Sequence, residues 1–258
     1  MTAVAGRVGL VLALPLLLFA IWYVATDSSR SFYVPPLRTI LAAFVDTWTL
    51  DRLRVDVLPS LLRLLAGYGL AVAFGVSLGV VIGTGRRIRA TLEPVLEFFR
   101  AIPPPVLVPV IMLFAGIGDG MKVIVIVSGC IWPILLNTVE GVRAVDGVLS
   151  DTARSYRITG WARLRHVVLR GASPQIVTGM RQALSIAIIL MVISEMFAAS
   201  NGLGFTIVQF QRSFAIPEMW SGVILLGLLG FALSALFSLA ENRILGWYRG
   251  VRGAQRQP

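Results

Sequence analysis

Side chains that could carry out chemistry are few in this sequence, and several kinds occur once. Lys122 is the one lysine, and no Ser or Thr follows it, so the chain lacks the Gly-Lys-Ser/Thr loop that binds nucleotide phosphates. His166 and Cys130 are the one histidine and the one cysteine, which leaves no set of residues for a metal site or an intrachain disulfide. We therefore expect no catalytic residue, no metal and no cofactor in this chain.

A few polar side chains lie inside apolar stretches, where they are costly unless they have a partner or line a wet cavity. Glu195 lies near the end of such a stretch; it either serves a solute path or is the buried partner of an arginine or a helix terminus. Asn137 lies deep in another stretch, where it bonds across helices or lines a path. Ser128, Met196 and Asn201 are further candidates for a translocation pathway, with packing as the alternative.

The elements that must position these groups are long and apolar. Hydrophobic residues make up 57% and charged residues 14% of the 258 residues, whereas a soluble domain has about 45–50% and about 25%. A helix needs roughly 20 apolar residues to cross a bilayer. The sequence therefore predicts an all-α membrane protein with about six transmembrane helices, tilted or kinked where Pro and Gly interrupt them. The six apolar windows are 8–26, 64–85, 101–118, 123–139, 182–200 and 219–240.

The distribution of basic residues predicts the orientation. With six spans, 16 of the 23 basic residues fall on one side of the membrane and 7 on the other. Because cytoplasmic loops are enriched in Arg and Lys, the richer side is expected to be cytoplasmic and to hold both termini. The net charge of +10 needs no nucleic-acid partner, since the chain has neither zinc-finger spacing nor an RNA-binding aromatic motif.

The connections on the opposite side are expected to differ in kind. Residues 27–59 are mixed in charge, and 37–48 have a helical periodicity that predicts a helix along the membrane surface. Residues 116–120 predict a Gly-rich turn, and 201–218 a longer connection. The first apolar window is too long for a signal peptide and has no clear cleavage site, so we expect it to be retained as a helix.

Three glycines in the second window lie four residues apart, at Gly75, Gly79 and Gly83. Residues at that spacing share one face of a helix, and a face without side chains lets another backbone approach closely. We predict that this face packs against a helix of the same chain or of a second copy. The alternative is that glycine is simply common in membrane helices.

The segment between the fourth and fifth windows, 151–185, reads DTARSYRITGWARLRHVVLRGASPQIVTGMRQALS. It resembles the signature loop of the membrane subunits of bacterial ABC importers, in which Glu-Ala-Ala is followed after three residues by Gly and after nine more by Ile-x-Leu-Pro. Residues 151–153 stand at the Glu-Ala-Ala positions, and Val167 and Leu169 at the Ile and Leu positions. The chain departs from the pattern at two positions, where Gly and Pro are usual: Arg157 and Arg170.

The flanking sequences extend this resemblance to about residues 30–245. They are similar to the nitrate/sulfonate/taurine branch of the family over FFRAIPPPVLVPVIMLFAGIGDGMKVIVIVSGCIWPILLNTVEGVRAVD (98–146), ISEMFAASNGLGFTI (193–207) and FYVPPLRTILAAF (32–44). The resemblance implies the type I ABC importer permease fold, in a multi-pass protein of the bacterial inner membrane.

In that family the signature loop forms a short coupling helix that lies in a groove of a cytoplasmic ATPase. The resemblance therefore implies that coupling falls to Asp151, Thr152, Ala153, Arg154, Ser155, Tyr156, Arg157, Ile158, Thr159, Gly160 and Trp161. Three apolar members, Tyr156, Ile158 and Trp161, would anchor the helix and transmit a rigid-body movement. The two arginine departures suggest pairing with an acidic groove in a dedicated ATPase.

The family also implies the partners and the division of labour. A homodimer of this chain would sit on two ATPase subunits, which bind ATP and Mg, and an external solute-binding protein would deliver the cargo. The cargo would be a small anion such as a sulfonate, nitrate or carboxylate, although the branch also serves pyrimidine and flavin precursors and aromatic carboxylates. The expected parts are 1–59, the first helix with the external segment; 60–245, the transport core with coupling loop 140–178; and 246–258, a basic tail.

Two functions of other classes compete with this interpretation. A gradient-driven secondary transporter would have several membrane-embedded acids and an inverted repeat, and the sequence shows one such acid and no repeat. A non-transporting scaffold would have no need of a long cytoplasmic loop suited to an ATPase.

Overall fold

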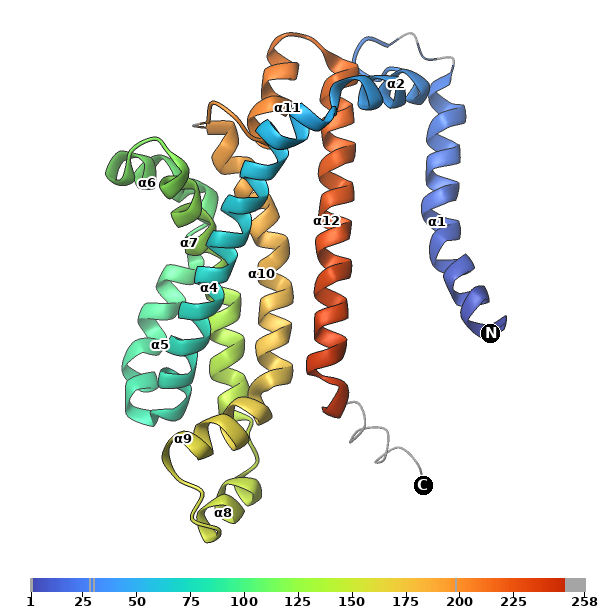
Figure 1. The fold of residues 1–258 in the computed structure, drawn as a ribbon. Coiled ribbons are helices and arrows are strands. Elements are labelled where there is room, and N and C mark those ends of the chain that lie inside the picture. The colour runs from blue at the N-terminus through green and yellow to red at the C-terminus, as the bar shows by residue number, and fades with distance from the viewer. Residues whose placement is uncertain (1, 28, 30, 198, 249–258) are drawn as a thin grey trace.

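The computed structural model describes residues 2–27, 29, 31–197 and 199–248, and this part of the chain is built of helices and their connections (Figure 1). The predicted all-α class is confirmed. The long helices are α1 (Thr2–Asp27), α4 (Leu58–Thr84), α5 (Arg86–Ala101), α7 (Asp119–Arg143), α10 (Leu169–Phe197) and α12 (Ile216–Ile244). The short ones are α2 (Leu37–Thr47), α3 (Leu50–Arg52), η1 (Leu53–Val57), η2 (Pro104–Val106), α6 (Leu107–Ala115), α8 (Gly147–Ser155), α9 (Gly160–Arg163), η3 (Leu164–Val168) and α11 (Leu203–Arg212).

Four helical stretches of the described chain are long and apolar enough to cross a membrane: Leu50–Thr84, Asp119–Arg143, Gly160–Phe197 and Ile216–Ile244. A bent pair, Arg86–Ala101 with Pro104–Ala115, makes a fifth if it counts as one span. In α1 the described apolar stretch is Leu17–Asp27. The described residues thus support four or five of the six predicted spans by length and composition, and α1 is the candidate for the sixth.

The window 101–118, predicted to be tilted or kinked where proline interrupts it, is sharply bent at three consecutive prolines near its start. Proline has no N–H to continue a helix, and it pushes the residue before it out of the helical region. Ile102 and Pro103 are accordingly extended, with ψ of 119° and 121°. Helix α5 ends at Ala101, and the axis turns by 74° into η2 and α6. The arginine-bearing stretch before this bend, which lies between the second and third predicted windows, forms helix α5.

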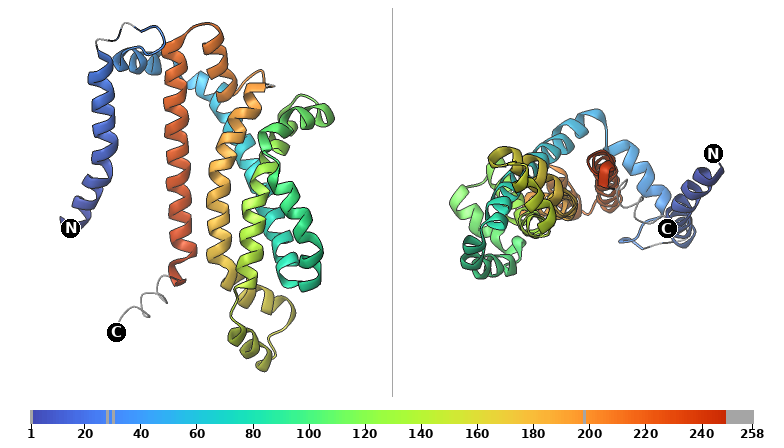
Figure 2. Two further views of the ribbon diagram at one scale, coloured as in Figure 1. Left: turned by 180° about the vertical axis from the view of Figure 1, so that it is seen from behind. Right: turned by 90° about the horizontal axis from the view of Figure 1, so that it is seen from below.

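The centre of the bundle is α7, which packs along its length against α4 on one side and α10 on the other. The buried cluster between them includes Leu64, Ile126, Ile134 and Leu190. Helix α5 lies on α4, and α12 contacts α10 (Figures 1 and 2). A gap separates most of helix α1 from the bundle (Figures 1 and 2), and α1 packs against the surface helix α2, which corresponds to the helix predicted over 37–48. Trp22 of α1 meets Trp220 of α12 edge to face, with ring centroids 5.9 Å apart.

The glycine face of α4 lies against α7. A Cβ atom built on Gly75, Gly79 or Gly83 would lie 2.9, 2.6 or 2.8 Å from the side chain of Ile134, Thr138 or Val142, closer than real Cβ atoms approach. Side chains of α7 therefore fill the space that the glycines leave, and the two backbones come close together.

Gly79→Ala is expected to destabilise the fold, because overpacking at a tight contact costs about 1–3 kcal/mol. Gly69→Ala, on the same helix, is the matched control: a Cβ there meets nothing within 4 Å, so the gain in helix propensity, up to about 1 kcal/mol, is unopposed. Thermal unfolding of both variants in one detergent measures the difference. If Gly79→Ala unfolds at the same temperature as Gly69→Ala, the close α4–α7 contact is not present in solution.

The two ends of the bundle carry different short helices (Figure 1). Helices α8 and α9 extend beyond one end, and α2 and α11 cover the other. The region 201–218, expected as a connection only, thus contains helix α11. Of the predicted basic tail, residues 249–258 lie outside the described part of the chain.

Candidate functional site

Residues 151–161 lie where the chain extends furthest beyond the bundle, on α8, the following turn and the start of α9 (Figure 1). Helix α8 begins after Asp146, whose side chain accepts a hydrogen bond from the Val148 N–H at 2.9 Å and so caps the helix. From Gly160 a continuous helix leads through α9 and η3 into α10, as far as Phe197. A displacement of the segment can therefore be passed directly to a membrane-spanning helix.

The turn after α8 is a Schellman motif that places Arg157 in the left-handed region. The Ile158 N–H donates to the Ala153 carbonyl at 2.8 Å, and the Arg157 N–H to the Arg154 carbonyl at 3.0 Å, as the motif requires. Arg157 has φ of 56°. This conformation favours glycine at the position after the helix cap, which explains why the signature has glycine there.

Arg157→Gly is expected to stabilise the turn by about 1 kcal/mol, since glycine adopts the left-handed conformation without the cost that a side chain imposes. The gain should appear as slower hydrogen exchange of the α8 amides. Arg154→Gly, inside α8, is the control and should speed that exchange, because glycine weakens a helix. Unchanged or faster exchange in Arg157→Gly would rule out strain at this turn.

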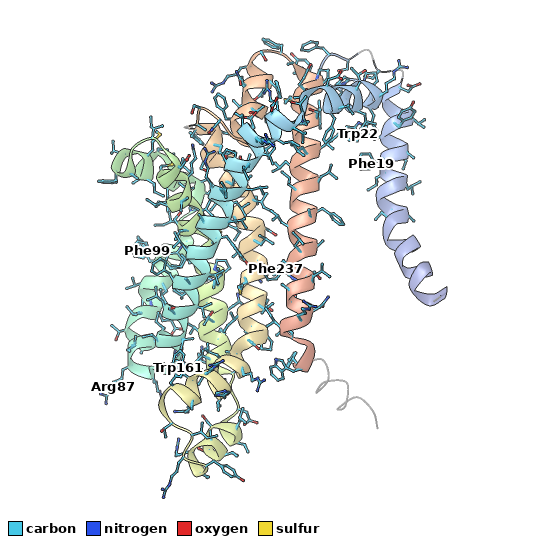
Figure 3. All side chains as sticks on the ribbon, viewed as in Figure 1. Phe19, Trp22, Arg87, Phe99, Trp161 and Phe237 are labelled. Carbon is cyan, nitrogen blue, oxygen red and sulfur yellow. The ribbon has the colours of Figure 1, made fainter. Side chains whose placement is uncertain are left out.

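The same segment presents apolar side chains to the outside while burying one small residue. The exposed fraction is 78% for Tyr156, 70% for Trp161 and 36% for Ile158, whereas that of Ala153 is 3%. Figure 3 shows Trp161 on the part of the segment nearest the bundle. Aromatic side chains exposed together in this way are typical of a protein–protein contact.

A second cluster of functional groups, the buried ionic network, lies at the opposite end of the bundle around Glu195. The carboxylate is fully buried and 2.7 Å from Nη1 of Arg63. It also accepts hydrogen bonds from the Ser60 hydroxyl at 2.7 Å and the Gly204 N–H at 2.9 Å. The network thus joins α4, the end of α10 and the start of α11.

Arg63, only 5% exposed, extends the network to α7 and to the loop before α11. Its guanidinium donates to Asp119 at 2.8 Å and to the Asn201 side-chain oxygen at 2.6 Å. Lys122, which is also buried, lies 3.3 Å from the same Asp119 carboxylate. Arg63, Lys122 and Glu195 are thus three buried charged groups, and each is compensated by an opposite charge and by hydrogen bonds, as buried charges must be.

Two glycines of the sequence NGLG allow the loop to close over Glu195. Gly202 has φ of 119°, and a Cβ there would lie 2.5 Å from the Glu195 carboxyl carbon. A Cβ on Gly204 would lie 2.5 Å from the Val192 carbonyl oxygen. Side chains at these positions would push the loop away from the carboxylate.

The structure brings two of the five proposed pathway residues together, Glu195 and Asn201, through Arg63. The other three lie apart from the network. Met196 is 45% exposed and borders a pocket with Phe197 and Arg212, Ser128 donates to the Val125 carbonyl at 2.7 Å, and Asn137 lies toward the other end of α7. The Asn137 amide donates to the Pro133 carbonyl at 2.8 Å and to Gln182 of α10 at 3.4 Å.

Sequence reasoning missed Arg63, Lys122 and Ser60. The two cations were counted among the basic residues of the outer connections, because each stands next to an apolar window. The signal in the sequence was Arg63 at the edge of an apolar window, with Ser60 one helical turn earlier on the same face of the helix.

Comparison with solved structures identifies the fold. The fold is similar to that of a chain of the MetNI methionine ABC transporter in inward facing conformations, with a TM-score of 0.62 and 21% identity, covering 77% of this chain and 95% of that one. An ABC transporter fold with several membrane-spanning helices is therefore present.

The chain belongs to the family described as binding-protein-dependent transport system inner membrane component, whose sequence profile matches residues 71–246. It is 28% identical over 249 residues to the taurine transport system permease protein TauC of Escherichia coli, covering 93% of this chain and 89% of that protein. It is 30% identical over 236 residues to the bicarbonate transport system permease protein CmpB of Synechococcus elongatus, covering 87% and 85%. The chain is accordingly the inner-membrane permease of an ABC importer.

Proposed function

We propose that this chain forms, as a homodimer, the membrane pathway of an ATP-driven importer that receives its cargo from an external binding protein. The observation that supports the proposal is the segment 151–161, which resembles the family signature apart from Arg157 and exposes Tyr156 and Trp161 beyond the bundle. A surface of this kind suits the groove of an ATPase subunit. ATP and Mg²⁺ would be bound by that subunit.

The proposed cargo is a small anion, such as a sulfonate, nitrate, bicarbonate or a carboxylate. The basis is the similarity to permeases named for taurine, which is a sulfonate, and for bicarbonate. Selectivity would reside in large part in the binding protein, since no single residue of this chain identifies a ligand. Ser128, Asn137 and Met196 remain the proposed pathway residues, while for Glu195 and Asn201 the contacts with Arg63 favour a structural role.

The proposed orientation places the coupling segment and both termini in the cytoplasm. The end of the bundle that carries α8 and α9 also carries Arg86, Arg87 and Arg89 at the start of α5, in keeping with the preference of basic residues for that side. The proposed parts are the N-terminal helix with its external segment, 1–59, the transport core, 60–245, with its coupling region, 140–178, and the tail, 246–258.

The proposal is tested by reconstituting the chain in liposomes with its ATPase and binding protein. Uptake of taurine or bicarbonate is expected only with ATP on the side of the coupling segment and with the binding protein on the other. Uptake driven by an ion gradient without ATP would favour a secondary transporter instead. Uptake by cells that survives deletion of this chain would favour a scaffold.

A further inference from the structure

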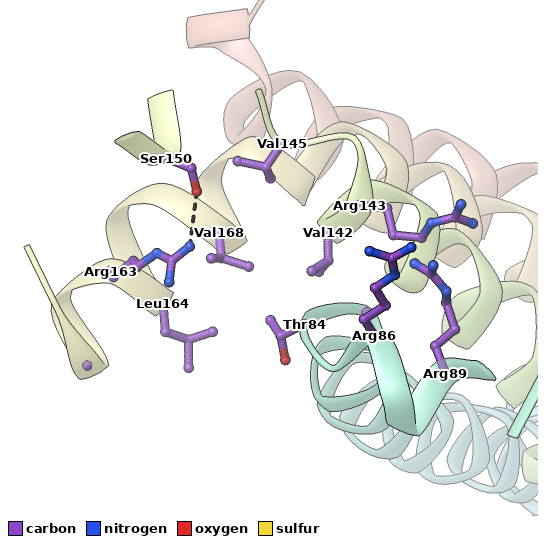
Figure 4. Close-up of a pocket in the computed structure, with 12 residues that line it drawn as sticks. Thr84, Arg86, Arg89, Val142, Arg143, Val145, Ser150, Arg163, Leu164 and Val168 are labelled. Carbon is purple, nitrogen blue, oxygen red and sulfur yellow. Dashed lines mark hydrogen bonds between the residues drawn. The ribbon is translucent and has the colours of Figure 1, made fainter. Parts of the chain in front are cut away.

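A pocket of about 570 Å³ lies where the coupling segment meets the bundle (Figure 4). Its walls come from the ends of α4 and α7, the start of α5, and the region α8–η3. Four arginines line it: Arg86, Arg89, Arg143 and Arg163. Figure 4 shows Arg86, Arg89 and Arg143 on one wall and Arg163 on another.

Three of the four arginines in this pocket form no ion pair with a described residue. Arg143 is paired with Glu140 at 2.6 Å, whereas among the described residues the Arg163 side chain has the Ser150 hydroxyl, at 3.0 Å, as its one hydrogen-bond partner. Arg86 and Arg89 form no salt bridge with any residue that the structure describes. Like charges gathered in one concavity repel each other and raise the local concentration of anions.

The start of α5 also contributes positive potential to the pocket, which opposes the partial negative charge at the carbonyl ends of α4 and α7 on the neighbouring walls. The helix begins at Arg86 after Gly85, and no side chain caps its first turn. The N–H groups of that turn have no partner within the helix, and the helix dipole places partial positive charge there. Anions bind readily at such a terminus when cationic side chains stand beside it.

We propose that this pocket binds a phosphate-bearing anion through Arg86, Arg89 and Arg163. Guanidinium groups on separate walls need an acceptor with oxygens in several directions, and a tetrahedral phosphate offers this where a planar carboxylate does not. The volume leaves room for more than phosphate alone, and valines 142, 145 and 168 with Leu164 provide an apolar wall. The phosphate would come from an anionic lipid headgroup or from a free phosphate compound.

The bound anion would tie the coupling segment to the bundle, because Arg163 belongs to α9 and Arg86 and Arg89 to α5. Bridging these elements would fix the angle at which the segment leaves the bundle. The site is distinct from the apolar surface of Tyr156 and Trp161 and goes beyond the transport function proposed above.

The test uses the full chain with Arg86→Gln and Arg89→Gln together. Arg87→Gln is the matched control, since Arg87 is one residue away and points away from the bundle (Figure 3). The chain is purified and exchanged into nanodiscs of phosphatidylcholine alone or with phosphatidylglycerol, and retained lipid is counted by native mass spectrometry. Binding of radiolabelled inorganic phosphate to the phosphatidylcholine nanodiscs is measured in parallel by equilibrium dialysis.

Each outcome supports or overturns the proposal. Retention of phosphatidylglycerol that falls about tenfold or more in the double variant, and not in Arg87→Gln, supports a lipid headgroup. The same pattern for inorganic phosphate alone supports a free phosphate compound. Equal binding of both probes by the double variant and Arg87→Gln overturns the proposal. If binding is unchanged but the double variant no longer retains the ATPase subunit, the proposal is also overturned, and the arginines belong to the interface with that subunit.

Discussion

Arg63→Ala is expected to lower the free energy of unfolding by about 3–5 kcal/mol, the largest effect of any single substitution considered. The reason is that the carboxyl group of Glu195, which is fully buried, would lose the cation 2.7 Å away that compensates it. The same change removes the donors to Asn201 and Asp119, so the loop before α11 and the start of α7 would lose contacts as well. Chemical or thermal unfolding of the purified chain measures the loss.

Arg54→Ala is the matched control for this prediction. Arg54 is exposed and lies in the same continuous helix, so its removal should change stability by no more than about 0.5 kcal/mol. The double variant Arg63→Met with Glu195→Met should recover much of the loss, because an apolar pair leaves no buried charge unpaired. Equal stability of Arg63→Ala and Arg54→Ala would contradict a buried ion pair at this site.

Asp151→Arg with Ala153→Arg is expected to uncouple ATP hydrolysis from uptake. Ala153 is 3% exposed, so an arginine there would displace α8, and the change at Asp151 would reverse the charge at the first signature position. Misplacement of a functional group by about 1 Å can lower a rate about 100-fold. We therefore expect the rate of uptake to fall by about that factor while the ATPase continues to hydrolyse ATP. Uptake and ATP hydrolysis are measured on the same proteoliposomes.

Ala90→Arg is the control for the added charge. Ala90 is exposed on α5 and lies outside the coupling segment, so this variant should transport normally. Normal uptake and normal substrate-stimulated hydrolysis in the Asp151 and Ala153 variant would remove the coupling role from the segment.

The parts that followed from the sequence are those set by long apolar stretches and by local motifs. Helices α4, α7, α10 and α12 coincide with apolar windows because a bilayer requires every backbone group of a span to be bonded within its own helix. The surface helix α2 was predicted from periodicity alone. The left-handed turn at Arg157 was not predicted, although it lies at the position where the family signature has glycine, a residue that favours this conformation.

The features that the sequence did not predict depend on which helices pack against each other. Arg63 and Lys122 look like ordinary flanking cations in the sequence, and only the packing of α4 against α7 and α10 brings them to Asp119 and Glu195. Helix α5 lies outside the predicted windows because its arginines are typical of a cytoplasmic loop, although the stretch is helical throughout. The choice between a pathway and a structural role for Glu195 likewise required a partner from another helix.

The most direct test of the central claim, that the segment 151–161 holds an ATPase subunit, is affinity purification of this chain in mild detergent with mass spectrometry of what accompanies it. We predict a stoichiometric ATPase subunit with the natural chain, and its loss when residues 151–161 are scrambled while the helical content is unchanged. Recovery of the folded chain alone in several detergents, or retention of the ATPase by the scrambled variant, would contradict the claim.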